Sequence, residues 1–208
     1  PVMLADDGAR HLQTIDPTTG APGLRLGTEW DSESDGTHSP QSDFDDLNPA
    51  PAPDDEDGVT FGFLNLGNPA ATTFVTVSGA PTSGAFLDAW MDFNQDNDWD
   101  DPGEQIFTNQ VVVNGVNNLT FAIPSTALTG DTYTRYRLSF GGGLAPDGGA
   151  SSGEVEDYKV EIVPWRYSFD FDGSRAITAC AILSLSSWLR GPHIMCSSLL
   201  PRRTVIPE

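Results

Sequence analysis

The chain has 208 residues, of which 38% are hydrophobic, and a formal net charge of −20. This length and hydrophobic fraction are enough for one folded domain with a sizeable core. The charge excludes nucleic acid and anionic membranes as partners on electrostatic grounds and leaves a cation as the simplest partner.

Residues 1–58 form an acidic segment with little periodicity and many Asp, Pro, Gly and Ser residues. Composition alone favours disorder here. The residues Asp31, Glu33 and Asp35 alternate, however, and a bound metal ion could order them, so they are weak candidate ligands. We expect an irregular, loop-rich N-terminal part of the domain. Because the chain begins at Pro1 with neither an initiator methionine nor an apolar signal segment, we expect either a mature product or a fragment.

Residues 59–164 carry the strand signals of the chain. The apolar residues Leu87, Ala89, Met91 and Phe93 occupy every second position, and the positions between them include Asp88 and Asp92. This is the period of a strand with one buried face. The predicted strands are 59–64, 73–77, 87–93, 106–113, 119–123, 136–140 and 158–162. This pattern predicts an all-β fold, an antiparallel β-sandwich of about seven strands with long acidic loops.

Two further sequence signals lie in or between these strands. The dipeptide Asn114-Gly115 can turn one strand into the next. Arg135 and Arg137 alternate with Tyr136, which predicts a half-buried strand with both arginines on its other face.

The segment DFNQDNDWDDPGE, residues 92–104, is predicted to bind a divalent cation. Carboxylates and amides alternate along its first half, as in the D-x-[DN]-x-[DN]-G loop, and point successive oxygens at one centre. Asp100 and Asp101 add further like charge. The predicted ligands are Asp92, Asn94, Asp96, Asp98 and Glu104.

Calcium is the expected ion, because it prefers six to eight oxygen ligands whereas magnesium keeps several waters. The segment departs from an EF-hand at Asn97 and Gly103, and a strand-like run follows it. We therefore expect a calcium loop between two strands. A solvated turn of Asp and Asn residues is the alternative.

Two more acidic runs, DDEDG and GEVEDY, suggest a second cation cluster. Glu154 and Glu156 share one face of a predicted strand, so they could chelate together or meet the first run across space. A solvated strand end explains them equally well. The candidate ligands are Asp55, Asp57, Glu154, Glu156 and Asp157.

Residues 165–208 differ from the body because they lose its acidity and contain both cysteines, Cys180 and Cys196. The most apolar stretch, 176–189, is too short for a convincing transmembrane segment. We expect a disordered or mis-framed tail, with a genuine anchor or interaction tail as the alternative. A disulfide, or a metal site that adds His193, is weakly supported because two thiols and one imidazole lack a full ligand set.

Five blocks of sequence, in order along the chain, carry a family resemblance. They are LGTEWDSESDG (26–36), DDEDGVTF (54–61), AWMDFNQDNDWDDPGEQIF (89–107), TYTRYRLSF (132–140) and SGEVEDYKVEI (152–162). Together they resemble the GEVED domain family, whose members look like β-sandwich modules of secreted or cell-surface bacterial proteins. The resemblance covers residues 1 to about 163 and implies no catalytic role. Members usually carry an Asp-Ala-Pro-Asp-type segment upstream of LADDGARH, so the resemblance implies that residues 1–58 are truncated at their start.

The resemblance and the acidic loops together predict a non-catalytic, calcium-stabilised structural or adhesion module of a bacterial exported protein. The resemblance implies an extracellular or cell-surface location. Neighbouring domains of a larger chain are the expected partners, together with a cell-surface protein or polysaccharide.

A carbohydrate-binding module attached to a secreted enzyme is the main alternative. The rings of a bound carbohydrate would stack on Trp30, Trp90, Trp99 or Tyr136. Glycoside hydrolysis by the module itself is not expected, because clustered Asp residues in a Gly/Asn-rich loop favour solvated, ionised groups. The paired carboxylates considered for it are Asp88, Asp92, Glu154 and Glu156.

Overall fold

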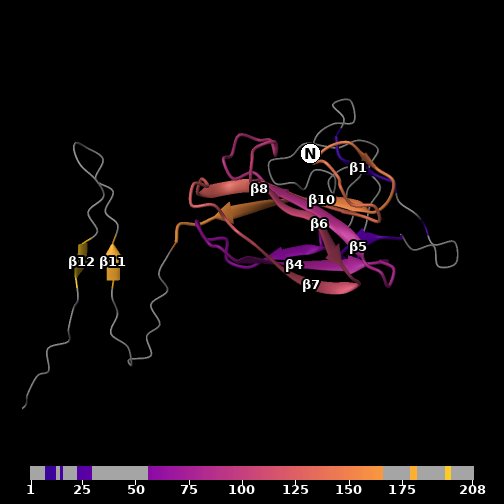
Figure 1. Ribbon diagram of the computed structural model, residues 1–208, viewed down its shortest axis with the longest axis horizontal. Coiled ribbons are helices and arrows are strands. Elements are labelled where there is room, and N and C mark those ends of the chain that lie inside the picture. Colours follow the sequence, from indigo (N-terminus) through magenta and orange to yellow (C-terminus); the bar gives the residue numbers. More distant parts are fainter. Residues whose placement is uncertain are drawn as a thin grey trace, which may run out of the picture. The chain divides into compact units, whose positions relative to one another are not determined.

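The structure is a computed structural model that describes residues 8–12, 15, 23–29, 56–165, 179–181 and 195–197. The chain divides into two compact units, Pro1–Arg166 and Tyr167–Glu208. Every regular element of the described residues is a β-strand, which confirms the predicted all-β fold (Figure 1). In this part of the chain, no helix is long and apolar enough to cross a membrane.

One sheet of the first unit contains four antiparallel strands. In spatial order they are β10 (Glu154–Ile162), β8 (Gly130–Ser139), β5 (Ala85–Met91) and β6 (Gln105–Val112). The pairing of β5 with β6 has irregular register after Leu87, where the chain approaches the acidic loop.

The second sheet is built around β4 (Ala71–Ser78). On one side β4 pairs with β7 (Gly115–Phe121), and on the other with β3 (Val59–Phe61) and β2 (Arg25–Leu26), all antiparallel. Figure 1 shows the two sheets as two layers, with β4 and β7 in the layer that faces β5, β6 and β8. The antiparallel sandwich expected from the sequence is confirmed.

Two further pairs of short strands lie outside the two large sheets. In the first unit β1 (Arg10–His11) pairs in parallel with β9 (Gly149–Ala150). In the second unit β11 (Ala179–Ala181) pairs antiparallel with β12 (Met195–Ser197). Among the described residues of the first unit there are seven strands of three or more residues, as predicted, and the two-residue strands are too short to show periodicity.

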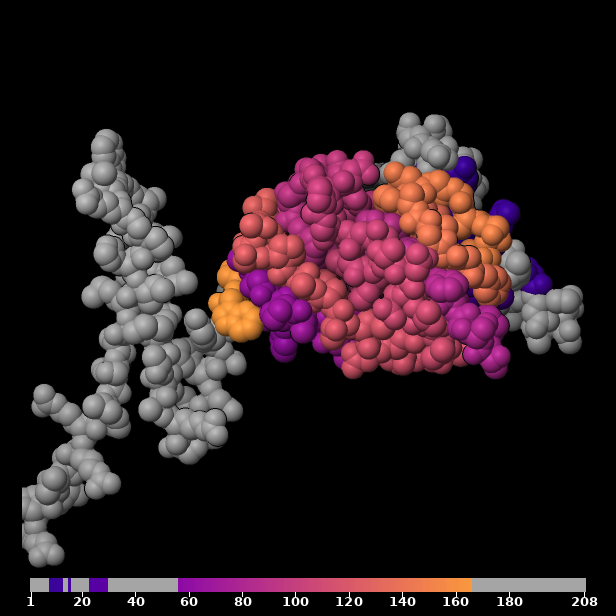
Figure 2. All heavy atoms as spheres, viewed as in Figure 1, coloured from indigo at the N-terminus to yellow at the C-terminus, as the bar shows by residue number. Residues whose placement is uncertain are grey.

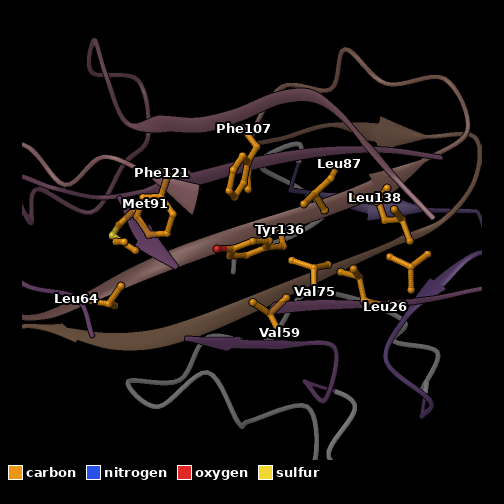
Figure 3. Close-up of a cluster of buried hydrophobic side chains, with 14 of the residues drawn as sticks. Leu26, Val59, Leu64, Val75, Leu87, Met91, Phe107, Phe121, Tyr136 and Leu138 are labelled. Atoms are coloured by element: carbon orange, nitrogen blue, oxygen red, sulfur yellow. The ribbon is translucent and has the colours of Figure 1, made fainter. Parts of the chain in front are cut away.

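The core lies between the two sheets and draws side chains from both (Figure 3). Tyr136 of β8 is fully buried near its centre, and its ring packs edge-on against Phe61 and Tyr158 at 5.9 and 6.3 Å. Aromatic pairs of this geometry add to the hydrophobic stabilisation that burial already gives. Ten of the core residues are labelled in Figure 3: Leu26, Val59, Leu64, Val75, Leu87, Met91, Phe107, Phe121, Tyr136 and Leu138.

The turn at Asn114-Gly115 does not join paired neighbours, because β6 and β7 belong to different sheets. Gly115 has a φ of 92°, so the tight turn itself is present. The Asn114 side chain bonds to the loop before β5: its Oδ1 accepts from Ala80 N and its Nδ2 donates to Ala80 O, each at 2.8 Å. These two bonds hold the turn where the chain crosses between the layers.

In Figure 2, pink residues from the middle part of the chain form much of the visible face.

The outer face of β8 is also buried, so the expectation of a half-buried strand is wrong. Arg135 and Arg137 are 1% and 0% exposed. The segment 140–153 folds over them, and Arg137 Nη1 donates to the carbonyl oxygens of Ala145 and Asp147, each at 2.6 Å. Backbone carbonyls thus replace the water that the sequence pattern implied.

Candidate metal centre

The acidic loop, residues 92–104, joins the end of β5 to the start of β6. Asp92 shapes its first turn: Oδ1 accepts from Gln95 N at 2.6 Å and Oδ2 accepts from Asn97 N at 3.0 Å. Gln95 and Asn97 have positive φ angles of 59° and 72°, a backbone conformation that Asn adopts readily. Both oxygens of Asp92, which is only 2% exposed, are therefore used to hold the backbone.

The exposed part of the acidic loop repeats one local hydrogen bond. Asn94 Oδ1 accepts from Asp96 N at 3.1 Å, Asp96 Oδ1 from Asp98 N at 3.3 Å, and Asp98 Oδ1 from Asp100 N at 3.0 Å. Such bonds from a side chain to the backbone two residues on are typical of Asp and Asn in turns. They curl the loop, so that side chains which alternate in sequence come together in space.

Three exposed carboxylates converge in this loop. Oxygens of Asp96, Asp98 and Asp101 all lie within 4.8 Å of one another. Asp96 Oδ2 and Asp101 Oδ2 both accept from Asn94 Nδ2. Calcium binds oxygens at 2.3–2.6 Å, so two ligands on opposite sides of one ion are about 5 Å apart. We call Asp96, Asp98 and Asp101 the outer cluster, and its spacing fits a single calcium ion.

Glu104 lies on the inner side of the same loop and is 3% exposed. Its Oε1 accepts from Phe93 N at 2.9 Å, whereas its Oε2 is buried and has no hydrogen-bond partner. Burial, followed by the charge of Asp92, raises the pKa of Glu104 from 4.5 to about 7. A buried carboxylate oxygen without a hydrogen-bond partner destabilises the fold, and a bound cation would offset that cost.

The structure divides the predicted ligands of this loop by location. Asp96 and Asp98 belong to the outer cluster, while Asp92 and Glu104 lie inside. Asp101 joins the outer cluster although the alternation did not select it. The sequence signal for it is the following Pro102-Gly103 pair, with Gly103 at a φ of 101°, which turns the chain back towards the start of the loop.

The inner face of β10 carries Glu154 and Glu156 of the second candidate cluster. Glu154 Oε2 accepts from Leu26 N at 2.7 Å. Glu156 Oε1 accepts from Gly58 N at 3.1 Å, and Glu156 Oε2 accepts from the Tyr158 hydroxyl at 2.8 Å. Burial, followed by the charge of Glu154, raises the pKa of Glu156 well above its usual range. The two carboxyl groups attach two N-terminal segments to the sandwich.

The remaining members of that cluster lie apart or outside the described residues. Asp57 accepts from the Thr28 backbone and hydroxyl at 2.7–3.1 Å. Asp157 projects from the other face of β10 and pairs with Arg135 at 2.6 and 2.7 Å. Burial would raise the pKa of Asp157, but the Arg135 charge keeps it below its usual range. Asp55 and the weaker set Asp31, Glu33 and Asp35 lie outside the residues that the structure describes.

A family model for the GEVED domain matches residues 86–161. The chain carries a GEVED domain. No curated protein and no solved structure matches the chain. The GEVED match begins in β5 and ends in β10, so it includes both the acidic loop and the strand with the acids that name the family. Residues 23–29 and 56–78, which precede the match, supply β2, β3 and β4 of the second sheet.

Proposed function

We propose that this GEVED domain is a non-catalytic, calcium-stabilised structural or adhesion module of a bacterial exported protein. It would act outside the cell or at its surface, where calcium is abundant. Neighbouring domains of a larger chain would be its first partners, with a cell-surface protein or polysaccharide as a further one.

The observation that carries the proposal is the arrangement of oxygens in the acidic loop. The outer cluster brings three carboxylates within 4.8 Å of one another, and the buried Glu104 Oε2 has no hydrogen-bond partner. Exposed like charges at this spacing repel one another, and the attraction of each carboxylate to a divalent cation would outweigh that repulsion. Calcium binding would thereby order the link between β5 and β6.

The locations of the carboxyl groups support a non-catalytic role. Those with raised pKa values, Glu104 and Glu156, are only 3% and 2% exposed, and each accepts a backbone hydrogen bond. Asp88 is 0% exposed and accepts from the backbone of Asn109 and Leu144. A general acid must reach the substrate, and these groups are enclosed by the fold.

The described aromatic residues favour a structural module over the carbohydrate-binding alternative. Trp90 and Tyr136 are 3% and 0% exposed, so neither can stack on a sugar. Trp99 lies over Arg135, with 4.3 Å from its ring centroid to the guanidinium carbon. Trp30 lies outside the described residues.

A calcium titration of the full chain tests the proposal. We expect saturable calcium binding by calorimetry, lost in the combined variant Asp96→Asn, Asp98→Asn and Asp101→Asn. Glu161→Gln, which removes an exposed carboxylate of β10, is the matched control and should bind as the unmodified chain does. Unchanged affinity in the triple variant would remove the outer cluster as the site, and no binding by the unmodified chain would refute calcium stabilisation.

A further inference from the structure

Trp99 connects the acidic loop to the outer face of the first sheet. It stands in the sequence between Asp98 and Asp100, and its ring lies over the Arg135 guanidinium at 4.3 Å. Its indole Nε1 is buried and has no hydrogen-bond partner. The contact of the ring with Arg135 therefore explains the position of this side chain, as cation–π and stacking interactions favour Trp above Arg.

Arg135 offers Trp99 a fixed surface. It is 1% exposed and lies on β8, an interior strand of the sheet. Its Nε and Nη2 donate to the two oxygens of Asp157 at 2.7 and 2.6 Å, and its Nη1 donates to Pro146 O at 2.8 Å. A two-bond pair with a carboxylate fixes the plane of a guanidinium.

We infer that Trp99 is a positioning residue of the cation site, an inference that rests on the proposed function. Trp99 separates Asp98 from Asp101, two members of the outer cluster. With its ring held on Arg135, the backbone between them has less freedom, and less entropy is lost when their oxygens close on an ion. Asp157 of the GEVED motif then supports the cation site through Arg135, without contacting the ion.

The test compares Trp99→Leu with Trp99→Phe in the full chain. Leucine removes the aromatic face, whereas phenylalanine keeps it. We expect the calcium dissociation constant to rise about 3- to 30-fold in Trp99→Leu and less than about threefold in Trp99→Phe. Trp165→Leu, at a tryptophan that is 52% exposed and outside the loop, should leave calcium affinity unchanged.

Thermal unfolding in chelator separates positioning from general stabilisation. A positioning role predicts that Trp99→Leu unfolds in chelator near the temperature of the unmodified chain while its calcium affinity is reduced. Trp99→Met, which keeps a large apolar side chain, gives the same comparison if the leucine variant does not fold. Unmodified affinity in the folded variant would overturn the inference and leave the calcium site standing. No calcium binding by the unmodified chain would overturn both.

Discussion

The carboxylates of the acidic loop differ in what their oxygens contact. Asp92 is buried and both of its oxygens accept backbone hydrogen bonds, whereas Asp96 and Asp101 are exposed, share the Asn94 amide as a donor and lie close to Asp98. The first arrangement stabilises the folded chain with or without an ion. The second brings exposed like charges together, an arrangement that a bound cation would stabilise. Substitutions at the two kinds of position should therefore respond differently to calcium.

Replacing Asp92 should destabilise the domain under all conditions. Asp92→Ala leaves the backbone N–H groups of Gln95 and Asn97 without their carboxylate acceptor, and we expect a loss of about 2–3 kcal/mol in the free energy of unfolding. Urea unfolding in calcium and in chelator measures it. Asp96→Ala is the control, expected within about 0.5 kcal/mol of the unmodified chain in chelator. Equal losses for the two variants in chelator would contradict the division into inner and outer carboxylates.

His11 should make the stability depend on pH. Its Nδ1 lies 2.8 Å from Ser152 O, so Nδ1 carries the proton and Nε2 accepts from Arg137 Nε at 3.1 Å. Burial, followed by the charge of Arg137 and then that of Arg135, lowers the pKa of His11 from 6.5 to about 3. The folded chain thus excludes a proton that the unfolded chain binds. The stabilisation by neutral His11 is complete above pH 6.5 and is lost as the pH falls towards 3.

The variant His11→Asn isolates this effect. Because Asn does not titrate, we expect the difference in melting temperature between the unmodified chain and the variant to shrink from pH 7 to pH 4.5. Both proteins are measured in chelator, so that calcium binding does not contribute. A difference that stays constant across this range would show that His11 does not titrate as its contacts indicate.

Among the elements, β10 makes side-chain contacts on both faces of the first sheet. Its inner face presents Glu154 and Glu156 to the N-terminal segments, and its outer face presents Asp157 to Arg135. Alternation along a strand produces this division, because successive side chains point to opposite faces. The acids that name the GEVED family therefore make different contacts within one strand.

The inner acids of β10 should hold β2 in place. In Glu154→Ala, the Leu26 amide loses the carboxylate oxygen that accepts its proton at 2.7 Å, and its hydrogen exchange should become at least tenfold faster. Exchange at Val75 in β4, the strand beside β2, should change much less. Glu161→Ala, an exposed substitution on the same strand, is the control. Equal protection of Leu26 in both variants would show that Glu154 does not attach this segment.

The sequence was sufficient to predict the longer strands, but not how they pair. Periodicity reports which side chains are buried, and it located seven strands close to where they lie. It carries no information about which sheet a strand joins, so the turn after β6 did not reveal a crossing between layers. The two residues of β2 have no measurable period, and contacts with Glu154 and β4 define that strand.

For the whole molecule, the spacing of Asp and Asn residues predicted the acidic loop, but folding decided which oxygens converge. The inward orientation of Asp92 and Glu104 depends on backbone N–H groups whose directions no sequence pattern specifies. Burial of Arg135 and Arg137 likewise depends on the 140–153 segment, which composition marks only as glycine-rich. Tertiary contacts settled both points.

We propose that calcium stabilises the whole first unit. An ion that binds only the folded chain adds about 2.7 kcal/mol at a free concentration 100 times its dissociation constant. For a domain of this size, that corresponds to a rise of about 5–10 °C in melting temperature. The ion would act through the loop between β5 and β6, two strands that lie in the same sheet as β10.

The most direct measurement is thermal unfolding of the full chain in excess calcium and in chelator, with magnesium as the control. If calcium stabilises the first unit, the melting temperature rises by about 5–10 °C in calcium and much less in magnesium. Equal melting temperatures in calcium and chelator would contradict calcium stabilisation and leave the acidic loop a solvated turn.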